Sequence, residues 1–188
     1  MFINKKVIVN KKRILIFLAL TIIGVGYRFL WRDIPNLEPI TLVCLLAGTY
    51  LGREKFLIPI ITMFVTDLFF GINAISIFVY SSFLVTVLLG KNIQSPWQSM
   101  LRGFYASTFF FLWTNFGVWL LFNMYPKNFA GLTECFIAGI PFYRNTLISA
   151  VVIVGIVYSV IYFWQLSYNK IAPRLRAKKD LSKETPVV

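Results

Sequence analysis

The stretch Thr114-Asn115-Phe116-Gly117-Val118-Trp119 decides how the rest of the chain is interpreted. It lies inside a strongly apolar run from Phe109 to Phe122 which, with the residues before it, is long enough to cross a bilayer. An amide in hydrocarbon has no water to bond, and leaving it unsatisfied costs several kcal/mol. Asn115 is therefore expected to face protein, a cavity or a ligand.

The composition of the 188-residue chain is typical of a polytopic membrane protein. Hydrophobic residues make up 58% of it and its mean hydropathy is +0.73, whereas soluble domains are about 45–50% apolar. The chain has 19 basic and only 7 acidic residues. The basic residues cluster at both termini, which favours flanks beside anionic lipid headgroups over nucleic-acid binding. The sequence contains no His, which excludes His-based acid–base chemistry and disfavours zinc sites.

The apolar runs predict an all-α membrane protein with six transmembrane helices in residues 14–168, between a basic N-terminus (1–13) and a basic tail (169–188). The first run is longer than the apolar core of a signal peptide, so we interpret it as a retained helix. The second is short for a bilayer but carries the close-packing pattern Gly48-x-x-x-Gly52. The expected spans are 14–30, 39–51, 56–70, 74–89, 100–122 and 146–166, and a long connection is expected over 123–145.

The distribution of charge predicts the orientation of these spans. With both termini in the cytoplasm, 15 of the 19 basic residues lie on the cytoplasmic side. The positive-inside rule favours that arrangement. We therefore predict a multi-pass protein of the bacterial inner membrane with both termini cytoplasmic.

In this orientation the polar side chains fall in the outer half of the predicted bundle. Asp67 lies at the outer end of the third span and Asn115 in the outer half of the fifth. Ionisable groups at membrane depth are functional candidates by default, so their convergence predicts a pocket open to the outside. The candidate substrate-binding residues are Asn36, Glu38, Asp67, Thr114, Asn115, Trp119, Tyr125 and Asn145.

Several of these residues have a structural alternative. Asp67 can pair with Arg28 or Arg32 as a lock between helices. Asn115 can bond a neighbouring backbone carbonyl. Trp119 follows Asn115 by four residues, lies on the same helical face and can share its pocket. Tyr125 can equally belong to the aromatic belt at the membrane interface.

The motifs of known enzyme classes are missing from the sequence. It has no Gly-x-Ser-x-Gly elbow, no Gly-rich phosphate loop and no His-based metal motif. A pair such as Glu38 with Asp67 or Glu134 could bind a divalent ion, but their spacing does not demand one. We expect no catalytic residue, no metal and no cofactor. Cys44, in the second span, and Cys135, in the long connection, are interpreted as free thiols.

Several separated motifs resemble a family of uncharacterised small bacterial membrane proteins. These motifs are Pro35-Asn36-x-x-Pro39-Ile40, Asp67 followed by Gly71, Thr114 to Trp119, Tyr125, Gly131-Leu132, Cys135 and Ile140-Pro141-Phe142. The family in turn resembles the substrate-binding S components of energy-coupling factor (ECF) vitamin transporters, through its six helices and its size. The resemblance covers Gly24 to Tyr158.

This resemblance implies an S-component-like bundle that captures a vitamin-like micronutrient from outside. It also implies a transmembrane coupling protein and ATPase subunits as partners, besides membrane lipids and the small-molecule substrate. The first helix departs from the S-component pattern Ala-x-x-x-Ala, because Ala19 is followed four residues later by Ile23. The alternatives are a structural or assembly protein without a small ligand, and a membrane enzyme acting on a lipid-like substrate.

Overall fold

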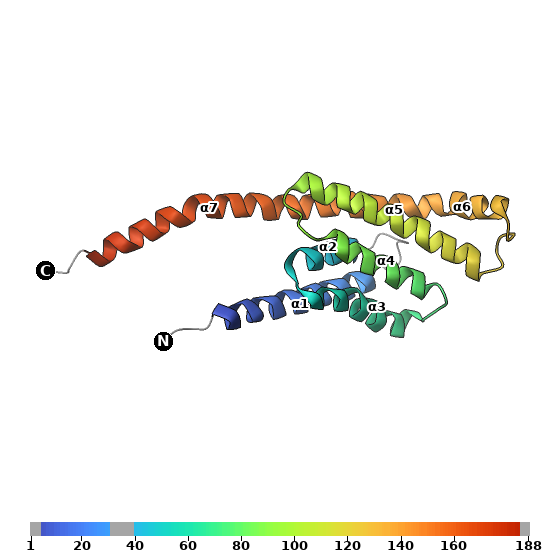
Figure 1. Ribbon diagram of the computed structural model, residues 1–188, viewed down its shortest axis with the longest axis horizontal. Coiled ribbons are helices and arrows are strands. Elements are labelled where there is room, and N and C mark those ends of the chain that lie inside the picture. The colour runs from blue at the N-terminus through green and yellow to red at the C-terminus, as the bar shows by residue number, and fades with distance from the viewer. Residues whose placement is uncertain (1–4, 31–39, 185–188) are drawn as a thin grey trace.

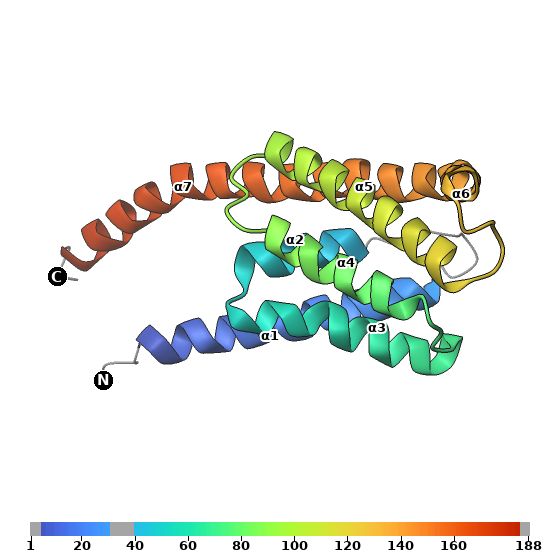
Figure 2. The same ribbon diagram turned by 45° about the vertical axis from the view of Figure 1, so that its right-hand side comes forward.

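The protein is a bundle of antiparallel helices in three layers (Figures 1 and 2). A computed structural model describes residues 5–30 and 40–184, with side chains at 11–30, 40–171 and 173. Every regular element in these residues is helical. In chain order they are α1 (Lys5–Leu30), α2 (Ile40–Tyr50), the 3-10 turn η1 (Arg53–Phe56), α3 (Leu57–Phe70), α4 (Ser76–Leu89), α5 (Pro96–Leu121), α6 (Phe129–Ile148), the π-helical segment η2 (Ser149–Ile153) and α7 (Val154–Glu184).

The layers follow from the order of contacts between the helices. Helices α1 and α3 form one layer, α2 and α4 the middle one, and α5 with the α6–η2–α7 rod the third (Figure 2). Both termini and the connections after α2 and α4 lie at one end, here called the terminal end (Figure 1). The connections after α3 and α5 lie at the opposite end, here called the far end. The expected all-α fold is confirmed for the described residues.

Local sequence signals begin and end these helices. At the start of α5, the Ser95 side chain accepts a hydrogen bond from the backbone N–H of Gln98, and Pro96 fits the first turn. At the start of α6, Asn128 accepts one from the N–H of Gly131 (2.9 Å). Helix α3 ends at Gly71, whose φ of +95° favours glycine.

The long connection expected over 123–145 is wrong for most of its length. Helix α6 begins at Phe129 and continues through η2 into α7, so that one rod runs from Phe129 to Glu184. Pro141 lies inside α6 without ending it. By local rules Pro141 favours a break in the helix, but tertiary packing along α5 outweighs this signal.

Among the described residues, three helices are long and apolar enough to cross a membrane. They are Lys11–Leu30, Pro96–Leu121 and Phe129–Ile171. The eleven residues of α2 rise only about 16 Å, well short of a bilayer core of about 30 Å. Most of α2 is buried all round, with Leu45 and Cys44 completely inaccessible. This helix therefore fills the centre of the bundle, as expected for a helix that is apolar on every face.

Glycines allow the layers to approach closely. A Cβ on Gly48 of α2 would overlap the Val87 carbonyl oxygen and stand 2.7 Å from the Cα of Gly90, so α2 and α4 touch backbone to backbone. Gly103 of α5 lies in the same way against the Ala150 carbonyl of η2. The predicted role of Gly48 is thus confirmed. Gly52 differs, because a Cβ there would meet the side chains of Glu54 and of Arg13 on α1 rather than helix backbone.

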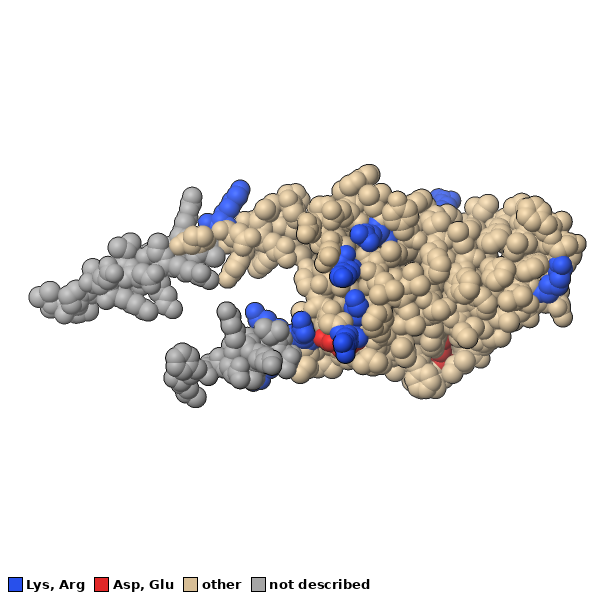
Figure 3. All heavy atoms as spheres, in the orientation of Figure 1, with Lys and Arg blue, Asp and Glu red and all other residues tan. Residues whose placement is uncertain are grey.

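The surface charge is uneven along the bundle. Lys and Arg side chains gather around the terminal end in the view of Figure 3, and few appear along the rest of that face. The gathering includes side chains from α1, η1 and the α4–α5 connection, among them Arg13, Arg53, Lys55 and Lys91. Among the described residues, the terminal end therefore carries more positive charge than the far end.

Candidate functional site

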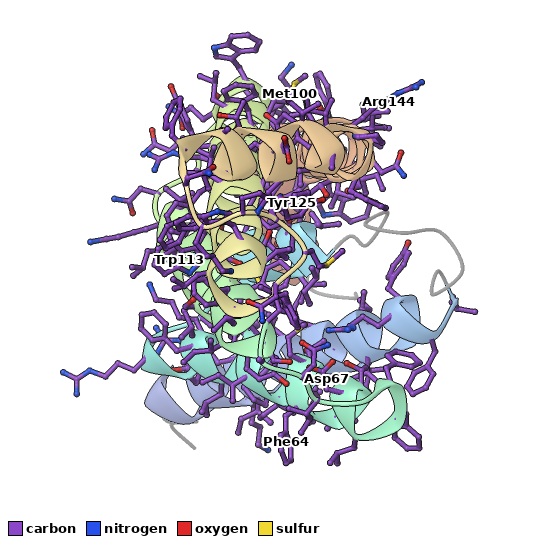
Figure 4. All side chains as sticks on the ribbon, turned by 90° about the vertical axis from the view of Figure 1, so that its right-hand side faces the viewer. Phe64, Asp67, Met100, Trp113, Tyr125 and Arg144 are labelled. Carbon is purple, nitrogen blue, oxygen red and sulfur yellow. The ribbon has the colours of Figure 1, made fainter. Side chains whose placement is uncertain are left out.

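A cavity of about 420 Å³ lies among α4, α5 and α6 in the far half of the bundle. We call it the Asn115 cavity. Helix α5 contributes Phe111, Thr114 and Asn115, α6 contributes the stripe described below, and the α5–α6 connection contributes Tyr125. In Figure 4, which looks onto the far end, Tyr125 lies between α5 and α6. Three of the eight predicted site residues thus line one cavity: Thr114, Asn115 and Tyr125.

The protein provides hydrogen-bond partners for only part of the Asn115 side-chain amide. Its Nδ2 donates a hydrogen bond to the Phe111 carbonyl oxygen, one turn earlier in α5, at 2.8 Å. Because a carbonyl can only accept, this bond fixes which end of the amide carries the nitrogen. Oδ1 then lies against Gly139, where a Cβ would stand 2.5 Å away. Among the described residues, no donor bonds that oxygen.

Aromatic rings form much of the cavity wall. Phe111 and Tyr143 stack across the α5–α6 interface with ring centroids 4.6 Å apart and planes inclined by 30°. The Tyr143 hydroxyl lies 2.8 Å from the Thr108 hydroxyl, which joins the same two helices. Such pairs offer flat apolar area together with a polar edge, as ligand pockets commonly do.

Trp119 does not line the cavity, although it is near Asn115 in sequence. Its indole Nε1 donates to the Pro126 carbonyl (2.9 Å), and the Lys127 ammonium lies 5.6 Å from the centre of its ring. The Lys127 ammonium also contacts carbonyl oxygens at the end of α5, including those of Trp119 and Phe122. Trp119 and Lys127 therefore hold the α5–α6 connection over the cavity, with the lysine at the negative end of the helix dipole.

Asp67 belongs to a separate cluster, which we call the Asp67 network (Arg28, Asp67 and Tyr80). The Arg28 guanidinium lies 3.2 Å from Oδ1 of Asp67, with both side chains almost fully buried. The Tyr80 hydroxyl donates to Oδ2 at 2.8 Å. Arg28 also contacts the Met63 sulfur and lies over the Phe70 ring. The network joins α1, α3 and α4, as the structural alternative for Asp67 predicts.

The remaining predicted residues do not join the described cavity. Asn145 lies on α6 but not among the side chains that line it. Asn36 and Glu38 fall outside the described residues. Figure 4 shows Asp67 well apart from Tyr125 in the view onto the far end. The predicted single polar cluster is thus divided between the cavity and the network on opposite sides of α4, with Val79 lining the cavity and Tyr80 in the network.

The α6 side of the cavity is not among the site residues predicted from the sequence. Cys135, Gly139, Phe142, Tyr143 and Thr146 all line the cavity. Their spacing of three to four residues is that of one helical face. Reading 123–145 as a connection hid this periodicity. Cys135 is buried within α6, where its thiol donates to the Asn115 carbonyl (3.3 Å), and both cysteines are free.

Metal chemistry has little support in the described part of the chain. No group of three or more His, Cys, Asp or Glu side chains there is close enough to hold a metal ion. In the cavity the polar groups are hydroxyl, amide and thiol. Such a lining suits hydrogen bonding to an organic molecule better than metal coordination.

Comparison with known proteins identifies a family without an assigned activity. The model of a family of unknown function (DUF6580) matches residues 9–174, which is most of the chain. The chain therefore belongs to this family. No curated protein and no solved structure matches it.

Proposed function

We propose that this DUF6580 protein is a membrane-embedded subunit that captures a small molecule in the Asn115 cavity. The observation that carries the proposal is the cavity itself. It has about 420 Å³ of space, aromatic walls and an amide oxygen that no described residue bonds. Ligand pockets of proteins are typically about 300–1,000 Å³, mostly apolar, with a few convergent polar groups.

The proposed orientation places the cavity in the outer half of the membrane. The terminal end carries most of the described basic side chains, so the positive-inside rule assigns it to the cytoplasm. The far end, with Tyr125 and the α5–α6 connection, then faces outside. In this arrangement α1, α5 and α6–α7 cross the membrane outright, and the shorter helices α2, α3 and α4 lie within it beside them.

Partnership with a transport machine is the finer part of the proposal. A capture subunit without its own ATPase needs a coupling protein and ATPase subunits, as the resemblance to ECF S components implies. Several exposed apolar residues of α1, such as Leu15, Leu18 and Ile22, offer an apolar face at the bundle surface. Gly24 is committed to packing on Thr62, whereas Gly26 has open space beside it. Such a partner would therefore meet α1 on a face without the Ala-x-x-x-Ala pattern.

The test compares small molecules that co-purify with wild-type protein and with Asn115→Ala. The full-length protein is purified in mild detergent, and bound molecules are released and identified by mass spectrometry. We expect a compound retained by the wild type and lost from Asn115→Ala. Asn169→Ala is the matched control, because it makes the same change on an exposed part of α7. Equal retention by Asn115→Ala and the wild type would refute the proposed site.

The Asp67 network favours a second candidate, a structural or assembly protein with no ligand. In that case its three side chains act as a lock between helices, and the Asn115 cavity is only a packing defect. This candidate predicts that no molecule co-purifies and that filling the cavity stabilises the protein. The two candidates therefore differ in a measurable way.

A further inference from the structure

The hydroxyl and amide groups of the Asn115 cavity direct most of their hydrogens into the protein. Thr114 donates to the Phe110 carbonyl (2.8 Å) and Thr146 to the Phe142 carbonyl (3.1 Å). Asn115 donates one of its two side-chain N–H groups to the Phe111 carbonyl. Each of these acceptors is a backbone carbonyl that cannot donate in return, so the directions of the bonds are fixed.

The direction of the Tyr143 bond follows from its neighbour. Thr108 has a single hydroxyl hydrogen, and its oxygen lies 2.8 Å from the Phe104 carbonyl, which can only accept. That hydrogen is therefore used, and the 2.8 Å contact between Thr108 and Tyr143 requires Tyr143 to donate. The Tyr143 hydrogen thus points away from the cavity, while the oxygen keeps its lone pairs.

What remains available to a ligand is mostly acceptor capacity. The free groups are Oδ1 of Asn115 and the lone pairs of the Thr114, Thr146 and Tyr143 oxygens. Against these stand two donors, the second N–H of Asn115 and the Tyr125 hydroxyl. An acceptor in an apolar pocket loses its water when a ligand enters, so a bound ligand must supply N–H or O–H groups.

The charge of the ligand follows from the lining as well. No Lys, Arg, Asp or Glu is among the described residues that line the cavity. An ion buried there would lose its hydration without gaining a counter-charge. The stacked Phe111 and Tyr143 rings favour a flat molecule beside them.

Resting on the proposed function, we infer that the cavity selects an uncharged, planar ring compound that carries hydrogen-bond donors, such as an aromatic amide or amine. Carboxylates and phosphorylated compounds are excluded by the missing counter-charge. Donor-free neutral compounds are disfavoured because they leave Asn115 Oδ1 unpaired. The preference for donor-bearing ligands arises because the side chains already donate to helix carbonyls. It therefore needs no movement of the backbone.

The experiment uses three probes of one shape. They are 2-naphthamide (neutral, with N–H donors), methyl 2-naphthoate (neutral, without donors) and 2-naphthoate (anionic). Binding to full-length protein in phosphatidylethanolamine–phosphatidylglycerol nanodiscs is measured by ligand-observed NMR, and empty nanodiscs correct for partition into lipid. We expect the amide to bind about five- to tenfold more tightly than the ester, which is the effect of one hydrogen bond. The carboxylate should bind weakest.

Two variants test whether the tighter binding of the amide than of the ester arises in the cavity. They are Asn115→Leu and Thr146→Val. Asn115→Leu removes the amide oxygen at similar volume and should reduce the amide-to-ester ratio to near one. Thr146→Val removes a second acceptor and should reduce the ratio in part, which keeps the assignment testable if Asn115→Leu fails to fold. If both variants fold and keep the wild-type amide-to-ester affinity ratio, the cavity is not the source of the preference.

The outcomes separate the inference from the proposed function. A wild type that binds the ester or the carboxylate as tightly as the amide, sensitive to Asn115→Leu, overturns the inferred ligand class while the cavity remains a binding site. No binding of any probe also overturns the inferred class. The co-purification comparison then decides the proposed function independently, because it assumes nothing about ligand chemistry.

Discussion

The Asp67 network and the Asn115 cavity lie on opposite sides of α4, and they treat buried polar groups differently. In the network, both carboxylate oxygens have a charged or hydroxyl partner within 3.2 Å. In the cavity, the Thr114 and Asn115 side chains bond their own helix and leave oxygens toward open space. Polar groups that bond one another stabilise the fold. Polar groups that keep unused hydrogen-bonding capacity beside a cavity are available to a ligand. Substitutions should therefore affect stability in the first region and binding in the second.

The largest effect is expected for Asp67→Leu. It removes the buried carboxylate that both Arg28 and Tyr80 contact, and breaking a buried ion pair costs about 3–5 kcal/mol. Equilibrium unfolding in mixed micelles with SDS measures this loss. The double variant Arg28→Met/Asp67→Leu removes both charges and should recover much of it. A loss below about 1 kcal/mol in the single variant would contradict the role of the network as a lock.

Two tyrosine substitutions compare the regions directly. Tyr80→Phe removes a hydrogen bond to a buried carboxylate and should cost about 1.5–3 kcal/mol. Tyr143→Phe removes a bond between two neutral hydroxyls and should cost about 0.5–1.5 kcal/mol. Both are measured as free energies of unfolding under the same conditions. If Tyr143→Phe costs more, the cavity wall is itself a structural lock.

Asn115→Ala is expected to change stability by less than about 1 kcal/mol, because it removes one local bond and gains helix propensity. Loss of ligand with retained stability is the signature of a binding residue. The unfolding midpoint of Asn169→Ala provides the reference for the substitution alone. A large loss of stability would instead move Asn115 into the same class as Asp67.

The smallest effect on stability is expected for Gly139→Ala. The new Cβ would meet the end of the Asn115 side chain, which can turn, and the edge of the Phe111 ring at 2.9 Å, while alanine favours the helix by about 0.5–1 kcal/mol. Stability should stay near that of the wild type while binding weakens, because Oδ1 is displaced. Gly103→Ala is the contrasting control: its Cβ meets the rigid Ala150 carbonyl and should destabilise by about 1–3 kcal/mol. Equal losses in both variants would show that the cavity wall is as rigid as the α5–η2 contact.

Much of the helix order could be predicted from apolar runs and charge. The first five expected spans all coincide with helices, although α2, α3 and α4 are shorter than a bilayer requires. The start of α6 could not be predicted in this way. Pro141 and Arg144-Asn145 mark a break by local rules, whereas contact of the Cys135–Gly139–Thr146 face with α5 keeps the segment helical.

The sequence by itself determined that the chain is helical, apolar and basic at its ends, and that Asn115 and Asp67 need partners. These properties depend on composition and on the cost of an unpaired polar group, which are the same in any fold. Only the tertiary structure decided which partners they have. Arg28 and Asp67 are 39 positions apart, and Asn115 and Gly139 are 24 apart, so helix packing alone brings them together. Helix packing gave both Asp67 carboxylate oxygens partners and left Asn115 Oδ1 beside a cavity.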